Sequence, residues 1–405
     1  MERSDIFAEL KVLDFATTVV GPSAARLFAD YGATVVKVES STHVDVLRTN
    51  QPYAGGKPGI NRSGYFALYN AGKYSISLNL NTPKAVELAR SLAKWADVVI
   101  ESYRPGIMKR WGLSYDELKK VKPDIIMAST NMLGQDGPHS MFRGYGHHGA
   151  ALAGWGTTLG WPDRDPILPF GAYSDYVSAR YVAIAILAAL EYRRRTGKGQ
   201  HIDNSQVECS IGFQAPLILD YSVNRRSIQR QGNRDPYAAP HGAYCGKGED
   251  RWVVIAVSTD EEWQAFCKVI GNLPWTKEPR FATLLSRKEN EDELNRLVGN
   301  WTINHTPEEI VDMMQQSGVG AAVVESSEDM SRDPQLKHRE HFKVFQHPEM
   351  GPYAYQSFGF RLSKTPGEPR GADPCLGQHN DYVCTELLGL SDEEFVQLMA
   401  EGVFE

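Results

Sequence analysis

The sequence has no run of apolar residues long enough to cross a lipid bilayer. A membrane-spanning helix needs about 20 predominantly apolar residues, and the stretch VAIAILAAL at 182–190 has nine. The first ten residues, MERSDIFAEL, lack the apolar core of a secretion signal. These absences predict a cytoplasmic protein with no membrane partner.

Cysteine is scarce, and basic residues are not in excess. The five cysteines are scattered among 405 residues without a C-x-x-C pair, so we expect reduced thiols rather than a disulfide framework or a zinc site. With a net charge of -7 and no long basic tract, a nucleic-acid partner is not expected, although a few local cations could hold a small polyanion. The adjacent His147 and His148 could ligate a metal, but sequence neighbours rarely present one face together. No metal site is predicted.

The glycine-rich turn that binds a dinucleotide is also missing from the sequence. The first predicted strand, helix and strand end on an acid, Glu39, where dinucleotide-binding folds place a ribose-binding carboxylate. The first turn offers only Gly21 where the pattern G-x-G-x-x-G would supply three glycines, which disfavours a nicotinamide-dependent enzyme. A helix opening at Pro22 could still present free N–H groups to another ligand.

What the sequence does contain is an alternation of short apolar strands and amphipathic helices. Strands are predicted at 10–15, 33–39, 74–80, 97–102 and 124–130. Helices are predicted at 22–31, 83–95 and 115–121. This alternation predicts a parallel α/β sheet covered on both faces.

The character of the sequence changes after the segment HIDNSQVE at 201–208. From about residue 223, a loop rich in Arg, Asn and Pro precedes two predicted strands and several amphipathic helices. The tail then resumes an α/β pattern and ends in two helices. We therefore expect a large α/β domain built from both chain ends, 1–222 and 331–405, and a smaller α+β domain at 223–330.

Asp175 lies at the head of a helix predicted at 176–195, which is apolar nearly all round and is therefore expected to be buried. As an N-cap, this carboxylate would accept a backbone N–H and stabilise the helix by about 1 kcal/mol. Alternatively, the helix N-terminus would keep it ionised at neutral pH in a partly apolar pocket. A poorly hydrated carboxylate is a competent nucleophile towards an activated acyl group. The residues leave both roles open.

Several cations lie near predicted strand ends. Arg104, Lys109 and Arg110 follow the strand that ends at Ser102, and Lys73 precedes another strand. Open α/β sheets bind ligands beyond the carboxyl ends of their strands, and Arg and Lys are the usual phosphate ligands. Each cation alone is typical of a solvated surface. Their shared location favours a phosphorylated ligand.

Five segments, in matching order and spacing, resemble the family III CoA-transferases, which include formyl-CoA:oxalate and carnitine CoA-transferases. The segments are 10–40, 70–83, 97–118, 174–208 and 375–394. The resemblance runs from about residue 8 to the C-terminus. It implies a Rossmann-like large domain, a small domain and two interlocked chains, as a homodimer or with a paralogous subunit.

The resemblance also implies an activity. Such enzymes move CoA from an acyl-CoA donor, such as succinyl-CoA, to a free carboxylic acid, and members acting on benzylsuccinate are similar to this chain. No tightly bound cofactor is implied. Asp175 would be the covalent nucleophile, forming first an acyl anhydride and then an aspartyl-CoA thioester.

Family motifs transferred residue by residue imply the CoA contacts, and Arg104 lies among them. The positions are Thr17, Thr18, Val19, Lys73, Ser102, Tyr103, Arg104, Arg110 and Asn131. Asn131 stands where relatives carry a lysine, and Ser41 where some carry a basic residue. Tyr145 and Gly146 stand where many relatives have Tyr-Asp. With His147 and His148, Tyr145 is a candidate for an unusual acid-binding pocket.

Two alternatives stay open. An α-methylacyl-CoA racemase of the same superfamily would use a His and an Asp for proton transfer, but the racemase His aligns with Tyr145, although His147 and His148 lie close by. A non-catalytic CoA-binding subunit of a heteromeric transferase would have no need of Asp175.

Overall fold

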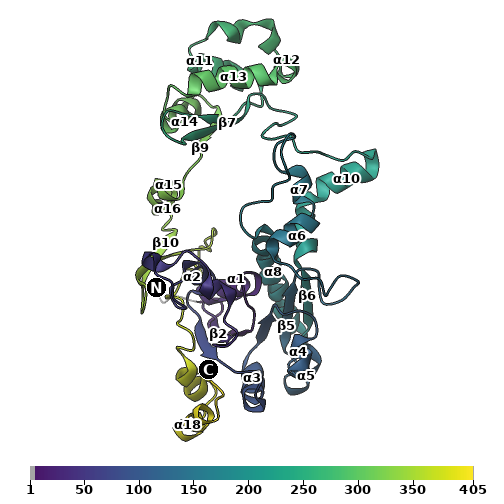
Figure 1. The fold of residues 1–405 in the computed structure, drawn as a ribbon, viewed down its shortest axis with the longest axis vertical. Coiled ribbons are helices and arrows are strands. Elements are labelled where there is room, and N and C mark those ends of the chain that lie inside the picture. The colour runs from purple at the N-terminus through teal and green to yellow at the C-terminus, as the bar shows by residue number, and fades with distance from the viewer. Residues whose placement is uncertain (1–4, 405) are drawn as a thin grey trace. The chain divides into compact units, whose positions relative to one another are not determined.

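The computed structural model describes residues 5–404, which form two compact units (Figure 1). The first unit contains the chain up to Thr157, residues 167–228 and residues 337 onward. The second contains residues 158–166 and 229–336. Both chain ends therefore belong to one unit. The domain boundaries given above at 222/223 and 330/331 remain predictions.

The first unit is built on a six-stranded parallel sheet in the order β3-β2-β1-β4-β5-β6. Its strands are β1 (Lys11–Asp14), β2 (Thr34–Glu39), β3 (Tyr74–Ser77), β4 (Val98–Glu101), β5 (Ile126–Asn131) and β6 (His201–Ser205). This order is that of a doubly wound, Rossmann-like sheet. The predicted parallel α/β architecture is confirmed, and β6 is an additional strand that its polar sequence did not reveal.

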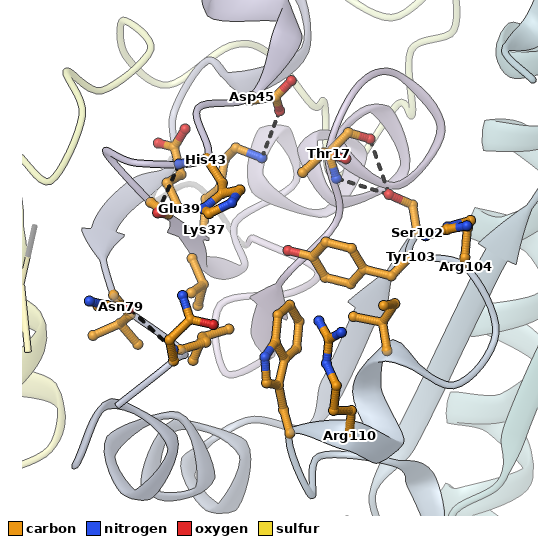
Figure 2. Close-up of a pocket in the computed structure, with 17 residues that line it drawn as sticks. Thr17, Lys37, Glu39, His43, Asp45, Asn79, Ser102, Tyr103, Arg104 and Arg110 are labelled. Carbon is orange, nitrogen blue, oxygen red and sulfur yellow. Dashed lines mark hydrogen bonds and ion pairs between the residues drawn. The ribbon is translucent and has the colours of Figure 1, made fainter. Parts of the chain in front are cut away.

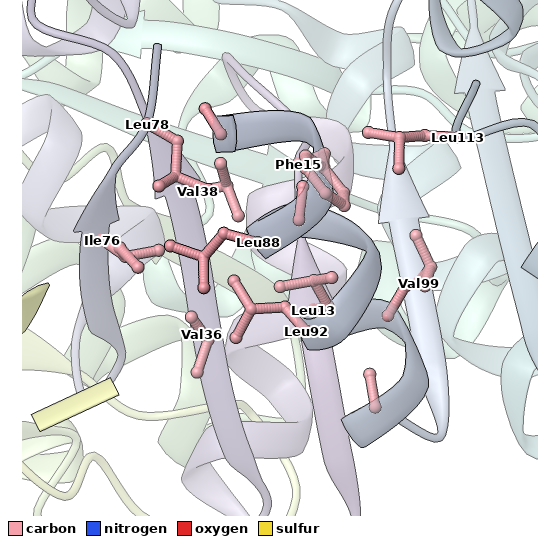
Figure 3. Packing of buried hydrophobic residues seen from close by; sticks show 14 of the residues in the cluster. Leu13, Phe15, Val36, Val38, Ile76, Leu78, Leu88, Leu92, Val99 and Leu113 are labelled. Atoms are coloured by element: carbon pink, nitrogen blue, oxygen red, sulfur yellow. The ribbon is translucent and has the colours of Figure 1, made fainter. Parts of the chain in front are cut away.

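Helices cover both faces of this sheet. On one face, α3 (Pro83–Trp95) places Leu88 and Leu92 against the strands, and α5 (Tyr115–Val121) extends the same core (Figure 3). On the other face, α1 (Val20–Asp30) and α8 (Tyr173–Thr196) share a second core. The helix α1 begins at Val20, so Pro22 lies inside its first turn rather than opening it.

Several shorter helices and one hairpin also lie wholly or mostly in the first unit. They are α2 (Gly64–Asn70), α4 (Ile107–Arg110), α6 (Gly146–Leu152), α7 (Trp155–Thr158), α9 (Gln206–Ile211), α10 (Ala215–Asn224), the antiparallel hairpin β10 (Phe342–His347) and β11 (Gly351–Gln356), α17 (Asn380–Tyr382) and α18 (Asp392–Ala400).

The prediction that the helix at 176–195 is wholly buried is wrong for the described chain. One face of α8, with Val182 and Ile186, packs on the sheet. On the other face Ile184 is 61% exposed and Leu187 is 41% exposed. The apolar sequence of a helix predicts burial, but it does not identify the surface that buries each face.

The second unit contains a three-stranded antiparallel sheet, β7 (His241–Cys245), β8 (Trp252–Ala256) and β9 (Gly320–Val323). Its helices are α11 (Asp260–Val269), α12 (Leu284–Glu289), α13 (Glu291–Thr302) and α14 (Pro307–Gln316), followed by α15 (Ser327–Arg332) and, spanning the boundary between the units, α16 (Pro334–His338). The stacked rings of Trp263 and Phe266 lie in its core. In residues 5–404, no helix is both long and apolar enough to cross a membrane.

Buried ion pairs lie at the carboxyl ends of β1 and β2. The Lys73 ammonium lies 2.8 Å from Asp14 Oδ2, and Arg48 donates to both carboxylate oxygens of Glu39 at 2.8 and 2.7 Å. All four residues are at most 7% exposed. Burial acts to raise the pKa of Glu39, but the guanidinium of Arg48 outweighs it and lowers that pKa. A buried charge of this kind is stable only beside its partner.

Replacing Arg48 with Met leaves Glu39 charged and buried without its partner. We expect the free energy of unfolding to fall by about 3–5 kcal/mol. In the double variant Glu39→Leu/Arg48→Met, most of this loss should be recovered, because no unpaired charge remains. Urea denaturation followed by circular dichroism measures both. A double variant no more stable than Arg48→Met contradicts the ion-pair interpretation.

Candidate active site

A cavity of about 440 Å³ opens at the carboxyl ends of β1, β2, β3 and β4 (Figure 2). This is the edge at which open α/β sheets bind their ligands. Among the residues predicted from the family resemblance, those that line it are Thr17, Ser102, Tyr103, Arg104 and Arg110. The sequence and the fold therefore bring together five side chains from two separate loops.

The loop after β1 forms one wall and is held by side chains of its neighbours. The backbone N–H of Thr17 donates to Ser102 Oγ at 2.9 Å, and that of Thr18 donates to the Asp45 carboxylate at 3.2 Å. Thr18 has a φ of 63°, which is a genuine outlier for a β-branched residue. Such a conformation persists only where its surroundings enforce it. This loop therefore reaches a left-handed turn through hydrogen bonds rather than through glycine.

The segment after β4 contributes an aromatic ring and two guanidinium groups to the lining of the cavity. Tyr103 points into the cavity (Figure 2), and its ring meets that of Trp111 edge-on at 5.1 Å. Burial, together with the negative charge of Glu101, raises the pKa of Tyr103, so its hydroxyl stays protonated and can donate. Arg104 and Arg110 are exposed at the rim. A flat apolar face beside paired cations suits an aromatic ring that carries phosphate.

Five other predicted CoA contacts or neighbouring cations, Thr18 among them, do not line this cavity. Lys73 is buried, and its ammonium donates to Asp14, Asn70 and the carbonyl of Pro22. Val19 is buried at the start of α1. Asn131 ends β5 and keeps a buried side-chain nitrogen without a hydrogen-bond partner in the described chain. Lys109 is exposed and is not among the residues that line the cavity.

Sequence reasoning missed the side of the cavity that follows β2 and β3. The residues concerned include Lys37, Ser40, His43, Asp45, Asn79 and Asn81. The signal was present, because these residues lie at the carboxyl ends of the predicted strands 33–39 and 74–80 or shortly after them. The rule that drew attention to Arg104 applies to them equally. His43 in particular adds an imidazole ring to the lining, two residues after Ser41.

Asp175 lies in the first turn of α8 and does not cap it. The helix begins at Tyr173, three residues earlier than predicted, and its N-cap is Ala172. Asp175 is 7% exposed, and no hydrogen bond to its carboxylate is present among residues 5–404. Burial raises the pKa of Asp175 to about 7. Desolvation thus opposes the expected effect of the helix N-terminus, which is to keep this carboxylate ionised at neutral pH.

The space around this carboxylate depends on a glycine of α6. A side chain at Gly146 would place its Cβ 2.8 Å from Asp175 Oδ1, closer than real contacts allow. Ser174 Oγ donates to the carbonyl of Gly146 at 2.7 Å and holds α6 against α8. An Asp at this position, expected from the family resemblance, would thus require Ala172 or the Asp175 side chain to shift.

The three residues suggested for an acid pocket surround the same turn of α6. Tyr145 is 66% exposed, and its backbone N–H donates to His148 Nδ1 at 3.1 Å. His147 and His148 are exposed. Among residues 5–404, no group of three or more His, Cys, Asp or Glu side chains is placed to hold a metal ion.

The chain is similar to known proteins over almost its whole length. Residues 7–380 match the model of the family described as CoA-transferase family III. The chain is 32% identical over 397 residues to succinyl-CoA–D-citramalate CoA-transferase of Chloroflexus aurantiacus, covering 98% of this chain and 97% of that protein. It is 30% identical over 391 residues to succinate–glutarate CoA-transferase of Agrobacterium fabrum, covering 95% and 96%.

A solved structure is similar over almost the whole chain. It is that of a CAIB/BAIF family protein from Brucella suis, with a TM-score of 0.87 and 30% sequence identity. The similarity covers 95% of this chain and 100% of that one. The mixed α/β fold described above is therefore shared with an experimental structure.

The burial of Asp175 has a measurable cost in stability. An unfolded Asp titrates at 3.8 and the folded one at about 7, so between these values only the unfolded chain loses its proton, and stability falls as the pH rises. Asp175→Asn removes this penalty. We expect it to raise the free energy of unfolding by up to roughly 4 kcal/mol at pH 8 and by nothing below pH 4.

Urea denaturation across this pH range measures the difference between Asp175→Asn and the wild type. Asp136→Asn, at an exposed carboxylate, is the matched control and should change stability little at any pH. A stability gain in Asp175→Asn that does not depend on pH would show that the carboxylate is not desolvated.

Proposed function

The chain belongs to CoA-transferase family III, and on this premise we propose that Asp175 carries CoA between a succinyl-CoA-type donor and a dicarboxylic acid. Acyl-CoA thioesters and free carboxylic acids are the substrates of such an enzyme. The observation that supports the role of Asp175 most strongly is its isolation. It is a buried carboxylate without a hydrogen-bond partner in residues 5–404, at the N-terminus of a 24-residue helix.

In the proposed first half-reaction, an oxygen of Asp175 attacks the thioester carbon of the donor. The C–S bond breaks, CoA leaves as a thiolate, and a mixed anhydride joins Asp175 to the donor acyl group. The thiolate then attacks the side-chain carbonyl carbon of Asp175. The anhydride C–O bond breaks, the donor acid leaves as a carboxylate, and Asp175 carries CoA as a thioester.

The second half-reaction reverses these steps with a different acid. The acceptor carboxylate attacks the aspartyl thioester, releases CoA thiolate and forms a second anhydride. The thiolate attacks the acceptor acyl carbon, which yields the new acyl-CoA and regenerates the Asp175 carboxylate. Charge balances without an external proton, oxidant or reductant. Water would hydrolyse either anhydride, so the burial of Asp175 protects the intermediates.

The cavity at the strand ends is the proposed site of the CoA nucleotide. Arg104 and Arg110 would hold phosphate groups, and the ring of Tyr103 would contact the base. Thr17, Thr18 and Ser102 would supply polar contacts along the loops. Lys73, held by Asp14, would act as a positioning residue beneath the cavity. The contacts proposed for Val19 and Asn131 lie outside the lining of this cavity.

The acid is proposed to be a dicarboxylate. The two similar enzymes act, by their names, on D-citramalate and on glutarate. Benzylsuccinate is a further proposed acceptor, since Tyr145, His147 and His148 offer aromatic and polar groups beside Gly146, which adjoins Asp175. A racemase would instead exchange the α-proton of an acyl-CoA for solvent deuterium, and this exchange should be absent.

Assembly with a second chain is also proposed, as an interlocked dimer or with a paralogous subunit. Like α8, the helix α10 exposes apolar side chains, among them Leu219, which is 62% exposed, and Val223, which is 77% exposed. Exposed apolar groups of this density are typical of interfaces. A non-catalytic role for this subunit is disfavoured by the isolated carboxylate of Asp175.

Asp175→Asn should lower CoA exchange by about 1,000-fold or more, because the amide cannot form the anhydride. The wild type is incubated with succinyl-CoA and citramalate, glutarate or benzylsuccinate, and new thioesters are scored by mass spectrometry. Hydroxylamine should label Asp175 only when acyl-CoA is present.

Acylation of Asp175 should rise with pH through about 7, as the carboxylate ionises. Undiminished exchange in Asp175→Asn refutes the nucleophile.

Arg110→Gln should raise the KM for acyl-CoA by about tenfold and leave kcat nearly unchanged, because a charged hydrogen bond to phosphate is lost outside the reacting centre. The matched control is Lys109→Gln, which removes the same charge one residue away, outside the cavity lining. Steady-state kinetics at fixed ionic strength measures both. Equal effects of the two variants would indicate general electrostatic attraction rather than a phosphate site.

A further inference from the structure

A second, smaller cavity in the first unit gathers positive charge without a lining carboxylate. It has a volume of about 190 Å³ and lies between α1, α2, α8 and the segment that follows β11. Its cationic residues are Arg26 of α1 and Arg180 of α8. Neither Asp175 nor any residue of the larger cavity lines it.

The two guanidinium groups approach the same aromatic ring. The Cζ of Arg26 lies 5.8 Å and that of Arg180 lies 5.9 Å from the ring centroid of Phe358. Arg180 donates to Ser23 Oγ at 3.2 Å, and no carboxylate lies within ion-pair distance of it in residues 5–404. Bringing like charges together in a partly enclosed space is unfavourable unless an anion balances them.

The nearest acid compensates this charge incompletely. Asp30 lies 3.5 Å from Arg26 Nη2 but does not line the cavity, and both of its carboxylate oxygens are buried without a hydrogen-bond partner. Burial raises the pKa of Asp30 to about 7, so it is partly protonated at neutral pH. Asp30 thus meets Arg26 only at 3.5 Å and from outside the lining, which leaves the cavity itself without an acidic group.

Two residues that line the cavity carry buried polar atoms without a hydrogen-bond partner in the described chain. Arg26 is 3% exposed and already donates to the carbonyls of Leu68 and Gln356, yet its Nε has no partner in the described chain. Ser357 Oγ, on a second lining residue, is likewise buried and unpartnered. Buried polar groups in native proteins are nearly always paired, and exceptions call for a ligand or another explanation.

From these observations we propose that the cavity is a binding site for a small oxyanion, a carboxylate or a phosphate, held between Arg26 and Arg180. The forked donors of Arg180 match the planar oxygens of a carboxylate, and Arg26 adds its positive charge and its unpartnered Nε–H. Leu68 and Phe358 offer apolar contact to a short carbon chain. The site is distinct from both the CoA cavity and Asp175, and it does not depend on the proposed function.

Occupancy of this site links segments that are distant in sequence. Arg26 and Ser23 come from α1, Arg180 from the helix that carries Asp175, and Phe358 from the C-terminal part of the chain. An anion that binds only the folded chain stabilises it according to its concentration and affinity.

Isothermal titration calorimetry and thermal unfolding, with inorganic phosphate or succinate against sodium chloride at equal ionic strength, test the proposal on the full-length protein. We expect saturable binding and a rising Tm in the wild type. Arg180→Gln, at an exposed position that should not impair folding, should weaken binding by about tenfold or more, the effect of losing a charged hydrogen bond. The tighter of the two anions identifies the chemistry of the occupant.

Two control variants separate this site from others. Arg110→Gln removes a cation from the larger cavity, and Arg296→Gln removes an exposed cation paired with Glu293 in the second unit. Both should bind the anion as the wild type does. Absence of saturable binding in the wild type, or equal binding in Arg180→Gln, overturns the proposal. Either result leaves the exchange assay on Asp175→Asn unaffected, so the two proposals fail separately.

Discussion

The loop after β1 depends on a set of buried charges beneath it. Asp14 binds both the Lys73 ammonium and the backbone N–H of Ala16, and Lys37 donates to the carbonyl of Ala16 at 2.7 Å. Asp45 accepts the N–H of Thr18, the residue with a φ of 63°. A dinucleotide-binding turn reaches a tight conformation with glycines, whereas here ion pairs impose it. This constraint positions one side of the larger cavity, because the backbone N–H of Thr17 donates to Ser102 Oγ and both residues line the cavity.

The second constraint is the free-energy cost of removing the Asp175 carboxylate from water. Asp175 is buried against α6 by the close approach that Gly146 allows, and its pKa rises to about 7 because no partner replaces its hydration. Such a group reduces the stability of the fold, but its oxygens are held neither by water nor by a hydrogen-bond donor, as those of a solvated or hydrogen-bonded carboxylate are. Buried Glu39 contrasts with it, since Arg48 satisfies both of its oxygens and lowers its pKa. Two buried acids in one unit thus serve opposite ends, one stabilising a loop and the other left available for chemistry.

Some elements follow directly from local signals. The predicted limits of α3 and α5 agree with the structure, since Thr82 and Pro83 open the first and Ser114 precedes the second. The polar strand β6 was missed because it lies at an edge of the sheet and carries no apolar pattern. Lys73 resembled a surface cation in sequence, but its position opposite Asp14 buries it. The residues after β2 and β3 could have been included by applying the strand-end rule to every strand.

The sequence by itself determined the parallel α/β class, the family and the candidate nucleophile, because hydrophobic periodicity and ordered motifs are local properties of the chain. Only the tertiary structure decided which charges are buried in pairs, which buried acids lack a hydrogen-bond partner, and which cations converge on a cavity. These properties depend on distances between residues far apart in sequence, such as Arg26 and Phe358 or Lys73 and Asp14. Electrostatic energy in a protein is set by such distances and by the local exclusion of water, and neither can be read from residue order.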